Sequence, residues 1–69
     1  MNQPMSTAAY ELRFRSLFNE GRALAFPCDQ EGHVALDALS ERARLNYFFA
    51  RHAVGREFSA PAVQAAAPH

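Results

Sequence analysis

The sequence predicts a small α+β fold, in which an antiparallel sheet with the chain order β-β-α-β carries one long helix on one face. Three observations lead to this prediction. Apolar and charged residues alternate at the start of Tyr10–Phe18, a turn leads to a second extended segment over Arg22–Cys28, and a helical period runs over Asp37–Gly55.

The first two strands are predicted from this alternation and from the turn between them. Side chains alternate over Tyr10–Arg15 as they do in a strand with one buried face. The alternation breaks at Ser16–Phe18, where we expect either a bulge or burial of both faces near the turn. Asn19–Gly21 predicts a hairpin turn, with a positive φ at the glycine. Pro27 lacks an N–H, so the returning strand ends there or lies at an edge of the sheet.

The second half of the chain is predicted from its caps and turns. Asp29–Gly32 predicts another turn. Asp37 is the predicted N-cap of the helix, because its carboxylate can accept from the free N–H groups of the first turn. Gly55 is the predicted helix end, again with a positive φ. Arg56–Val63 is expected to form a third strand or extended segment.

We expect one folded domain over residues 10–63, with a disordered arm at 1–9 and a disordered, low-complexity tail at 64–69. The N-terminal residues lack the basic and apolar segments of a secretory signal. No apolar run approaches the ~20 residues that span a bilayer. These features predict a cytoplasmic protein.

Composition excludes several classes of protein. The 69 residues contain seven basic and seven acidic side chains, so the formal net charge is zero. A strongly basic nucleic-acid binder is therefore not indicated. Cys28 is the single cysteine of the sequence, which excludes an intrachain disulfide.

The helix has more apolar residues than one face can hold. The stripe predicted to face the sheet consists of Leu39, Ala43, Ala50 and Val54, with Tyr47 and Ala53 on its flanks. Leu45 and Phe49 fall to one side of this stripe, and Phe48 falls almost opposite it among charged residues. Either the arm, the hairpin or the last strand covers these residues, or they form a contact face for a partner or a second copy.

The only cluster that suggests chemistry is Cys28, Asp29 and His33, near one turn. A thiolate, a carboxylate and an imidazole are the groups of a zinc site or of a Cys–His nucleophile pair. No second pair of metal ligands has the required spacing, and nothing indicates a third group that orients a base. We therefore expect no catalytic residue, no metal and no cofactor.

Nucleic-acid binding is the alternative function. Arg13 and Arg15 share the polar face of the first strand, and Arg44 and Arg51 lie on the helix. Aromatic residues stand among them, as in the segment at 46–51. Acidic residues balance this charge, so a weak interaction with nucleic acid is the most that the pattern indicates.

Five short segments resemble a type of small uncharacterised protein from β-proteobacteria such as Burkholderia. These are FNEGR at 18–22, AFPCD at 25–29, GHV at 32–34, LSERAR at 39–44 and VGREF at 54–58. The resemblance covers about Tyr10 to Val63 and implies a bacterial, cytoplasmic protein. It transfers no functional residue, because the group has no established activity.

The leading hypothesis is a non-enzymatic interaction or oligomerisation module, of which a homodimer is one form. Its contact residues are Leu45, Phe48 and Phe49.

Overall fold

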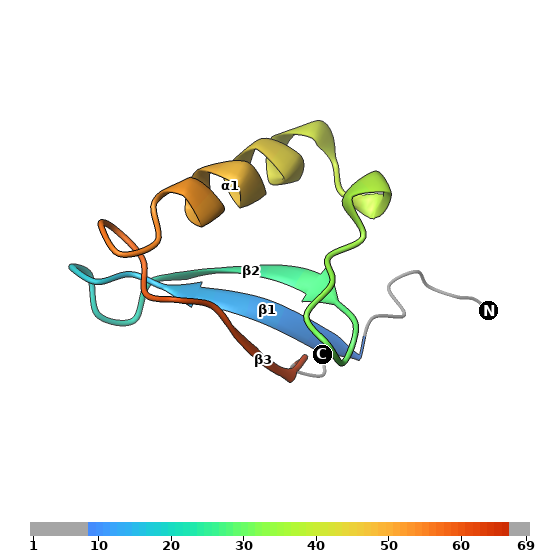
Figure 1. Ribbon diagram of the computed structural model, residues 1–69, viewed down its shortest axis with the longest axis horizontal. Helices are drawn as coiled ribbons and strands as arrows, with labels where there is room; N and C mark the ends of the chain where they lie inside the picture. Colours follow the sequence, from blue (N-terminus) through green and yellow to red (C-terminus); the bar gives the residue numbers. More distant parts are fainter. Residues whose placement is uncertain (1–8, 67–69) are drawn as a thin grey trace.

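The computed structural model describes residues 9–66 (Figure 1). Its elements are β1 (Tyr10–Arg15), β2 (Ala23–Cys28), the 3-10 helix η1 (Leu36–Ala38), α1 (Glu41–His52) and β3 (Ala62–Ala65). The three strands form an antiparallel sheet in the order β2-β1-β3. The predicted class, a small α+β fold with one helix on an antiparallel sheet, is confirmed. Residues 1–8 of the predicted arm and 67–69 of the predicted tail lie outside the described part of the chain.

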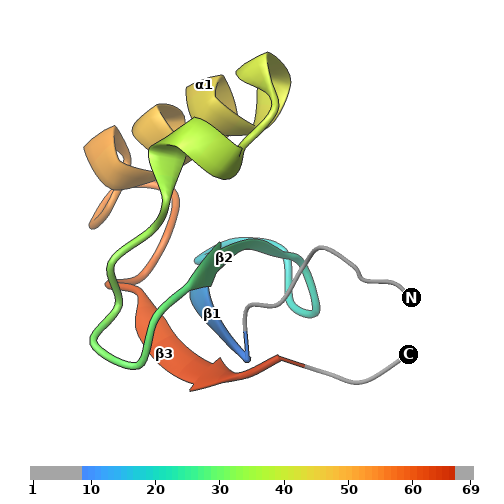
Figure 2. The same ribbon diagram turned by 90° about the vertical axis from the view of Figure 1, so that its right-hand side faces the viewer.

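The central strand β1 places the apolar side chains on one side of the sheet. Leu12 lies opposite Phe26 of β2 and opposite Val63 of β3. Directly opposite residues of antiparallel strands point to the same side, so these three share a face. Figure 2 shows α1 on one side of the sheet, and no other element within residues 9–66 covers the opposite side.

The core lies between the sheet and α1. Its buried side chains are Leu12, Phe14, Phe26, Cys28, Leu39, Tyr47, Ala50, Ala53 and Phe58. Ala43 and Val54 are partly buried against them. The predicted rotation of the helix is therefore confirmed, and the small alanines of the stripe let α1 approach the sheet closely.

The predicted start of the helix is wrong. The helix begins at Glu41 rather than near Asp37, and its N-cap is Ser40, whose Oγ accepts from the N–H of Ala43 at 3.1 Å. Asp37 instead belongs to η1, and Leu39, directly after η1, has an extended backbone. Aspartate and serine both cap helices well, and Asp37 and Ser40 are three positions apart. Because Leu39 between them is extended, no helix can run from Asp37 through it, and Ser40 caps α1.

The helix ends shortly before the predicted position, because its last residue is His52 and its C-cap is Ala53, two residues ahead of Gly55. Gly55 has a φ of 89° and Gly21 in the hairpin has a φ of 86°, as expected from their positions. The carbonyl of Ala53 accepts from the N–H groups of Arg56 and Glu57 at 3.0 and 2.8 Å. These bonds close the turn that follows α1 and satisfy a carbonyl that the helix leaves free.

Gly55→Ala should lower the free energy of unfolding by about 1 kcal/mol, because a Cβ disfavours positive φ. A Cβ at this position would have no heavy atom within 4 Å outside its chain neighbours, so the effect is conformational and not steric. Urea denaturation measures it. Gly55→Asn is the control and should lose less, because asparagine tolerates left-handed backbone. Equal losses in both variants would contradict the argument.

The predicted third strand is displaced along the chain. The strand covers Ala62–Ala65, whereas we expected an extended segment over Arg56–Val63. Residues 56–58 take part in the turn after α1, and Pro61 has no N–H for a ladder. The domain boundary at Val63 is also too early, because Gln64 and Ala65 pair with Glu11 and Tyr10.

Candidate functional site

The candidate site is an apolar surface on the side of α1 turned away from the sheet. We call it the outer helix face and define it by Leu45, Phe48 and Phe49, which are 64%, 49% and 49% exposed. At 100° per residue the three fall within one arc of about 100°, roughly opposite the buried stripe. Large apolar side chains on the surface of a small protein forgo the stabilisation that their burial would give.

Both phenylalanine rings of this face contact another aromatic ring of the chain. Phe48 lies against Tyr47, with ring centroids 5.7 Å apart. Phe49 meets the buried Phe58 edge-on, with centroids 5.9 Å apart. Within residues 9–66, neither the hairpin nor β3 covers the two phenylalanines fully, and about half of each side chain is exposed to solvent. Two of the three side chains of the outer helix face are thus in contact with rings of their own chain.

Polar side chains stand at the two ends of this face. Glu41 begins α1 and His52 ends it, and both are exposed. A carboxylate at the N-terminus and a basic side chain at the C-terminus each complement the helix dipole.

Two of the three arginines of α1, Arg44 and Arg51, are turned toward their own chain. The Arg51 Nε donates to the Tyr47 hydroxyl at 3.0 Å, and its guanidinium lies 5.6 Å from the centre of that ring. Arg44 donates to the Leu39 carbonyl at 3.4 Å and is partly buried. Both side chains flank the outer helix face without covering it.

The hairpin carries a second pair of exposed apolar residues that our sequence interpretation missed. Leu17 is 48% exposed and Phe18 is 76% exposed. The Ser16 Oγ accepts from the N–H groups of Phe18 and Asn19, which turns the chain before these side chains can enter the core. The break in alternation at 16–18 was the available signal, but burial of both faces is the wrong interpretation of it.

The structure does not gather the four arginines of the nucleic-acid hypothesis on one surface. Arg13 and Arg15 alternate with Leu12 and Phe14, so they project from the open side of the sheet. Arg44 and Arg51 belong to α1, on the other side of the sheet (Figure 2). A nucleic-acid backbone would have to contact both the open side of the sheet and α1 to reach all four arginines.

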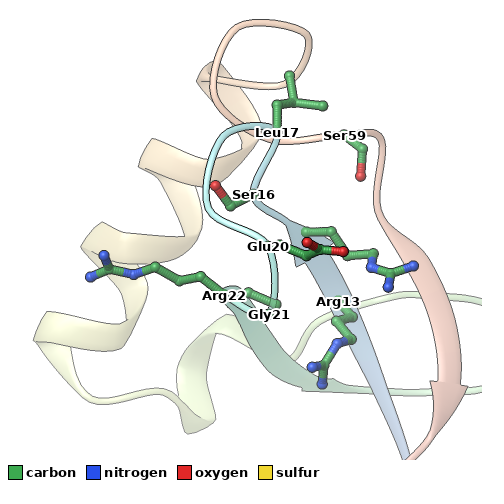
Figure 3. A pocket seen from close by; sticks show the side chains of 9 residues that line it. Arg13, Ser16, Leu17, Glu20, Gly21, Arg22 and Ser59 are labelled. Carbon is green, nitrogen blue, oxygen red and sulfur yellow. The ribbon is translucent and has the colours of Figure 1, made fainter.

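A hollow of about 350 Å³ lies beside the hairpin on the open side of the sheet (Figure 3). Its charged lining consists of Arg13, Arg15, Arg22 and Glu20. The Arg13 guanidinium donates to the Glu11 carboxylate at 3.3 Å. Figure 3 shows Arg22 extending away from Arg13, so these two cations do not converge on one point. With acidic side chains in and beside it, the hollow is not a focused anion site.

The side chains near the Asp29–Gly32 turn do not form a nucleophile pair. Cys28 is buried, and its burial raises the pKa of the thiol, with the charges of Asp29 and Glu11 adding to this effect. The His33 Nδ1 lies 3.1 Å from the Asp29 carboxylate on the exposed side of the turn. The pKa of Asp29 is lowered, chiefly because its carboxylate accepts from the backbone N–H of His33. This arrangement closes a turn and leaves the thiol protonated.

No group of three or more His, Cys, Asp or Glu side chains within residues 9–66 is placed to hold a metal ion. In the same range, no helix has the length and apolar character needed to cross a membrane.

Comparison with known proteins gives no match to a family model, a curated protein or a solved structure. The resemblance to a β-proteobacterial protein type therefore stays an expectation.

Proposed function

We propose that this chain is a non-enzymatic protein–protein interaction module that binds through the outer helix face. The observation that supports the proposal is the exposure of Leu45, Phe48 and Phe49 on the side of α1 opposite the core. The proposal includes the bacterial, cytoplasmic setting that the sequence resemblance implies.

Two features of this face favour binding over simple exposure. The contacts of Phe48 with Tyr47 and of Phe49 with Phe58 already restrict both rings, so less side-chain freedom is lost when a partner covers them. Each half-exposed ring also offers roughly 100 Å² of apolar surface. Aromatic side chains of this kind are enriched among the residues that dominate binding energy.

The proposal is tested by photo-cross-linking in host cells. A photoreactive benzoylphenylalanine in place of Phe48 should give covalent protein adducts, because its ketone lies within the proposed interface. The matched control carries the same group in place of Arg15, which projects from the open side of the sheet. Equal adducts from both positions, or none from position 48, would contradict the proposal. Adducts with nucleic acid from position 15 would favour the alternative function.

A further inference from the structure

Four side chains along the outer side of α1 have the spacing of a helix–helix seam. Glu41, Leu45, Phe48 and His52 are separated by four, three and four residues. In an α-helix such a series returns to one side, as the paired seam positions of coiled coils do. All four side chains are exposed, and together they run the full length of α1.

This seam is symmetric about its own midpoint. The midpoint lies between Leu45 and Phe48, with Glu41 and His52 at equal distances on either side. A twofold axis through that point would turn a second α1 antiparallel to the first. Glu41 then meets His52 of the second copy, and Leu45 meets Phe48 of the second copy. Twofold interfaces require this reciprocity, in which each residue of a pair occurs on both sides.

The polar ends of the seam favour the antiparallel arrangement over the parallel one. An antiparallel pair places the carboxylate of Glu41 beside the imidazole of His52 at both ends of the interface. It also sets the positive end of each helix dipole beside the negative end of the other. A parallel pair in register would place two Glu41 carboxylates together, and like charges in contact disfavour association.

We infer that the occupant of the outer helix face is a second copy of this chain, whose α1 packs antiparallel on the first with Glu41 against His52. This inference rests on the proposed function and specifies its partner. Phe49 lies beside Leu45 and covers one flank of the seam. Arg44 and Arg51 lie on the other flank, where their bonds to Leu39 and Tyr47 hold them to their own chain.

The size of the seam predicts a weak dimer. Two half-exposed phenylalanines and one leucine supply roughly 300 Å² of apolar surface per copy. A standard stable interface buries about 800 Å² per partner. We therefore expect a monomer–dimer equilibrium that appears at high micromolar concentration.

Sedimentation equilibrium of the full chain, at concentrations up to about 1 mM and neutral pH, measures this equilibrium. His52→Glu should weaken the dimer about tenfold, because it opposes two carboxylates at each of two symmetry-related sites. Glu41→Lys should also weaken it. The double variant Glu41→Lys/His52→Glu should restore association to at least the original level, because each lysine then meets a glutamate of the other copy.

The double variant separates this arrangement from simple damage to α1. The double variant places a lysine at the N-terminus and a glutamate at the C-terminus of α1, and both oppose the helix dipole. If the single variants weakened association only by fraying the helix, the double variant would associate least. Circular dichroism on every variant reports the helix itself. Glu20→Lys makes the same charge change at the hairpin and should leave association unchanged.

Two results would overturn the inference. One is a chain that stays monomeric up to about 1 mM, and the other is a double variant that associates no better than His52→Glu. Neither result bears on the proposed function, because cross-linking at position 48 records a protein partner of any kind. A lack of adducts there would contradict the proposed function itself.

Discussion

Phe14→Ala should lower the free energy of unfolding by about 3–5 kcal/mol, the usual cost of replacing a buried phenylalanine with alanine. Its side chain is 0% exposed and meets three other rings edge-on. The centroid of Phe14 lies 5.9 Å from that of Phe26, 6.3 Å from that of Tyr47 and 6.4 Å from that of Phe58. This one ring therefore joins β1 to β2, to α1 and to the segment before β3.

A loss of this size would unfold a large fraction of the molecules. Stabilities of roughly 0.05–0.15 kcal/mol per residue leave a chain of this length only a few kcal/mol in reserve. Urea denaturation followed by far-UV circular dichroism measures the loss. Phe18→Ala removes the same atoms from a side chain that is 76% exposed, and it should change stability little. Similar losses in the two variants would contradict the central place of Phe14 in the core.

Phe48→Ser should leave the fold intact and weaken self-association or binding of a partner by about 2 kcal/mol, or roughly 30-fold. Half of the ring is open and the other half rests on Tyr47, so the stability loss should stay near 1 kcal/mol. Sedimentation equilibrium and thermal unfolding should be measured on the same variant. Phe18→Ser is the matched control, because it makes the same change on an exposed ring of the hairpin.

The two measurements distinguish three outcomes for Phe48. Loss of association with stability retained supports the outer helix face. A stability loss of about 3–5 kcal/mol would mean that another part of the chain covers the ring. A variant that keeps both properties would show Phe48 to be an ordinary surface residue, and the proposed function would lose its main support.

The sequence was sufficient to predict which side of α1 is buried, because the 3.6-residue period fixes the relative directions of Ala43, Ala50 and Phe48. The start of the helix was not predictable in this way. Asp37 and Ser40 are both good N-caps, and the choice between them depends on the extended backbone at Leu39.

The third strand and the surroundings of the site depended on contacts between distant residues. Phe58 has the spacing of a strand residue, yet it is buried by the turn after α1 and supports Phe49. The helical period placed Leu45, Phe48 and Phe49 away from the buried stripe, but it left open whether other segments cover them. The contact of Phe49 with Phe58 joins two segments of the tertiary fold, and the local sequence pattern does not predict it. The contact of Phe48 with Tyr47 likewise depends on how Tyr47 packs in the core.

The central position of β1 has a consequence for synthesis on the ribosome. Its hairpin partner β2 follows it closely along the chain, but β3 is translated only after α1. Until Ala62–Ala65 leave the exit tunnel, β1 has one free edge of unpaired backbone groups. Open strand edges pair readily with other chains, so neighbouring nascent chains on one messenger are exposed to strand exchange during that interval. Pairing of Ala62–Ala65 with β1 ends this period.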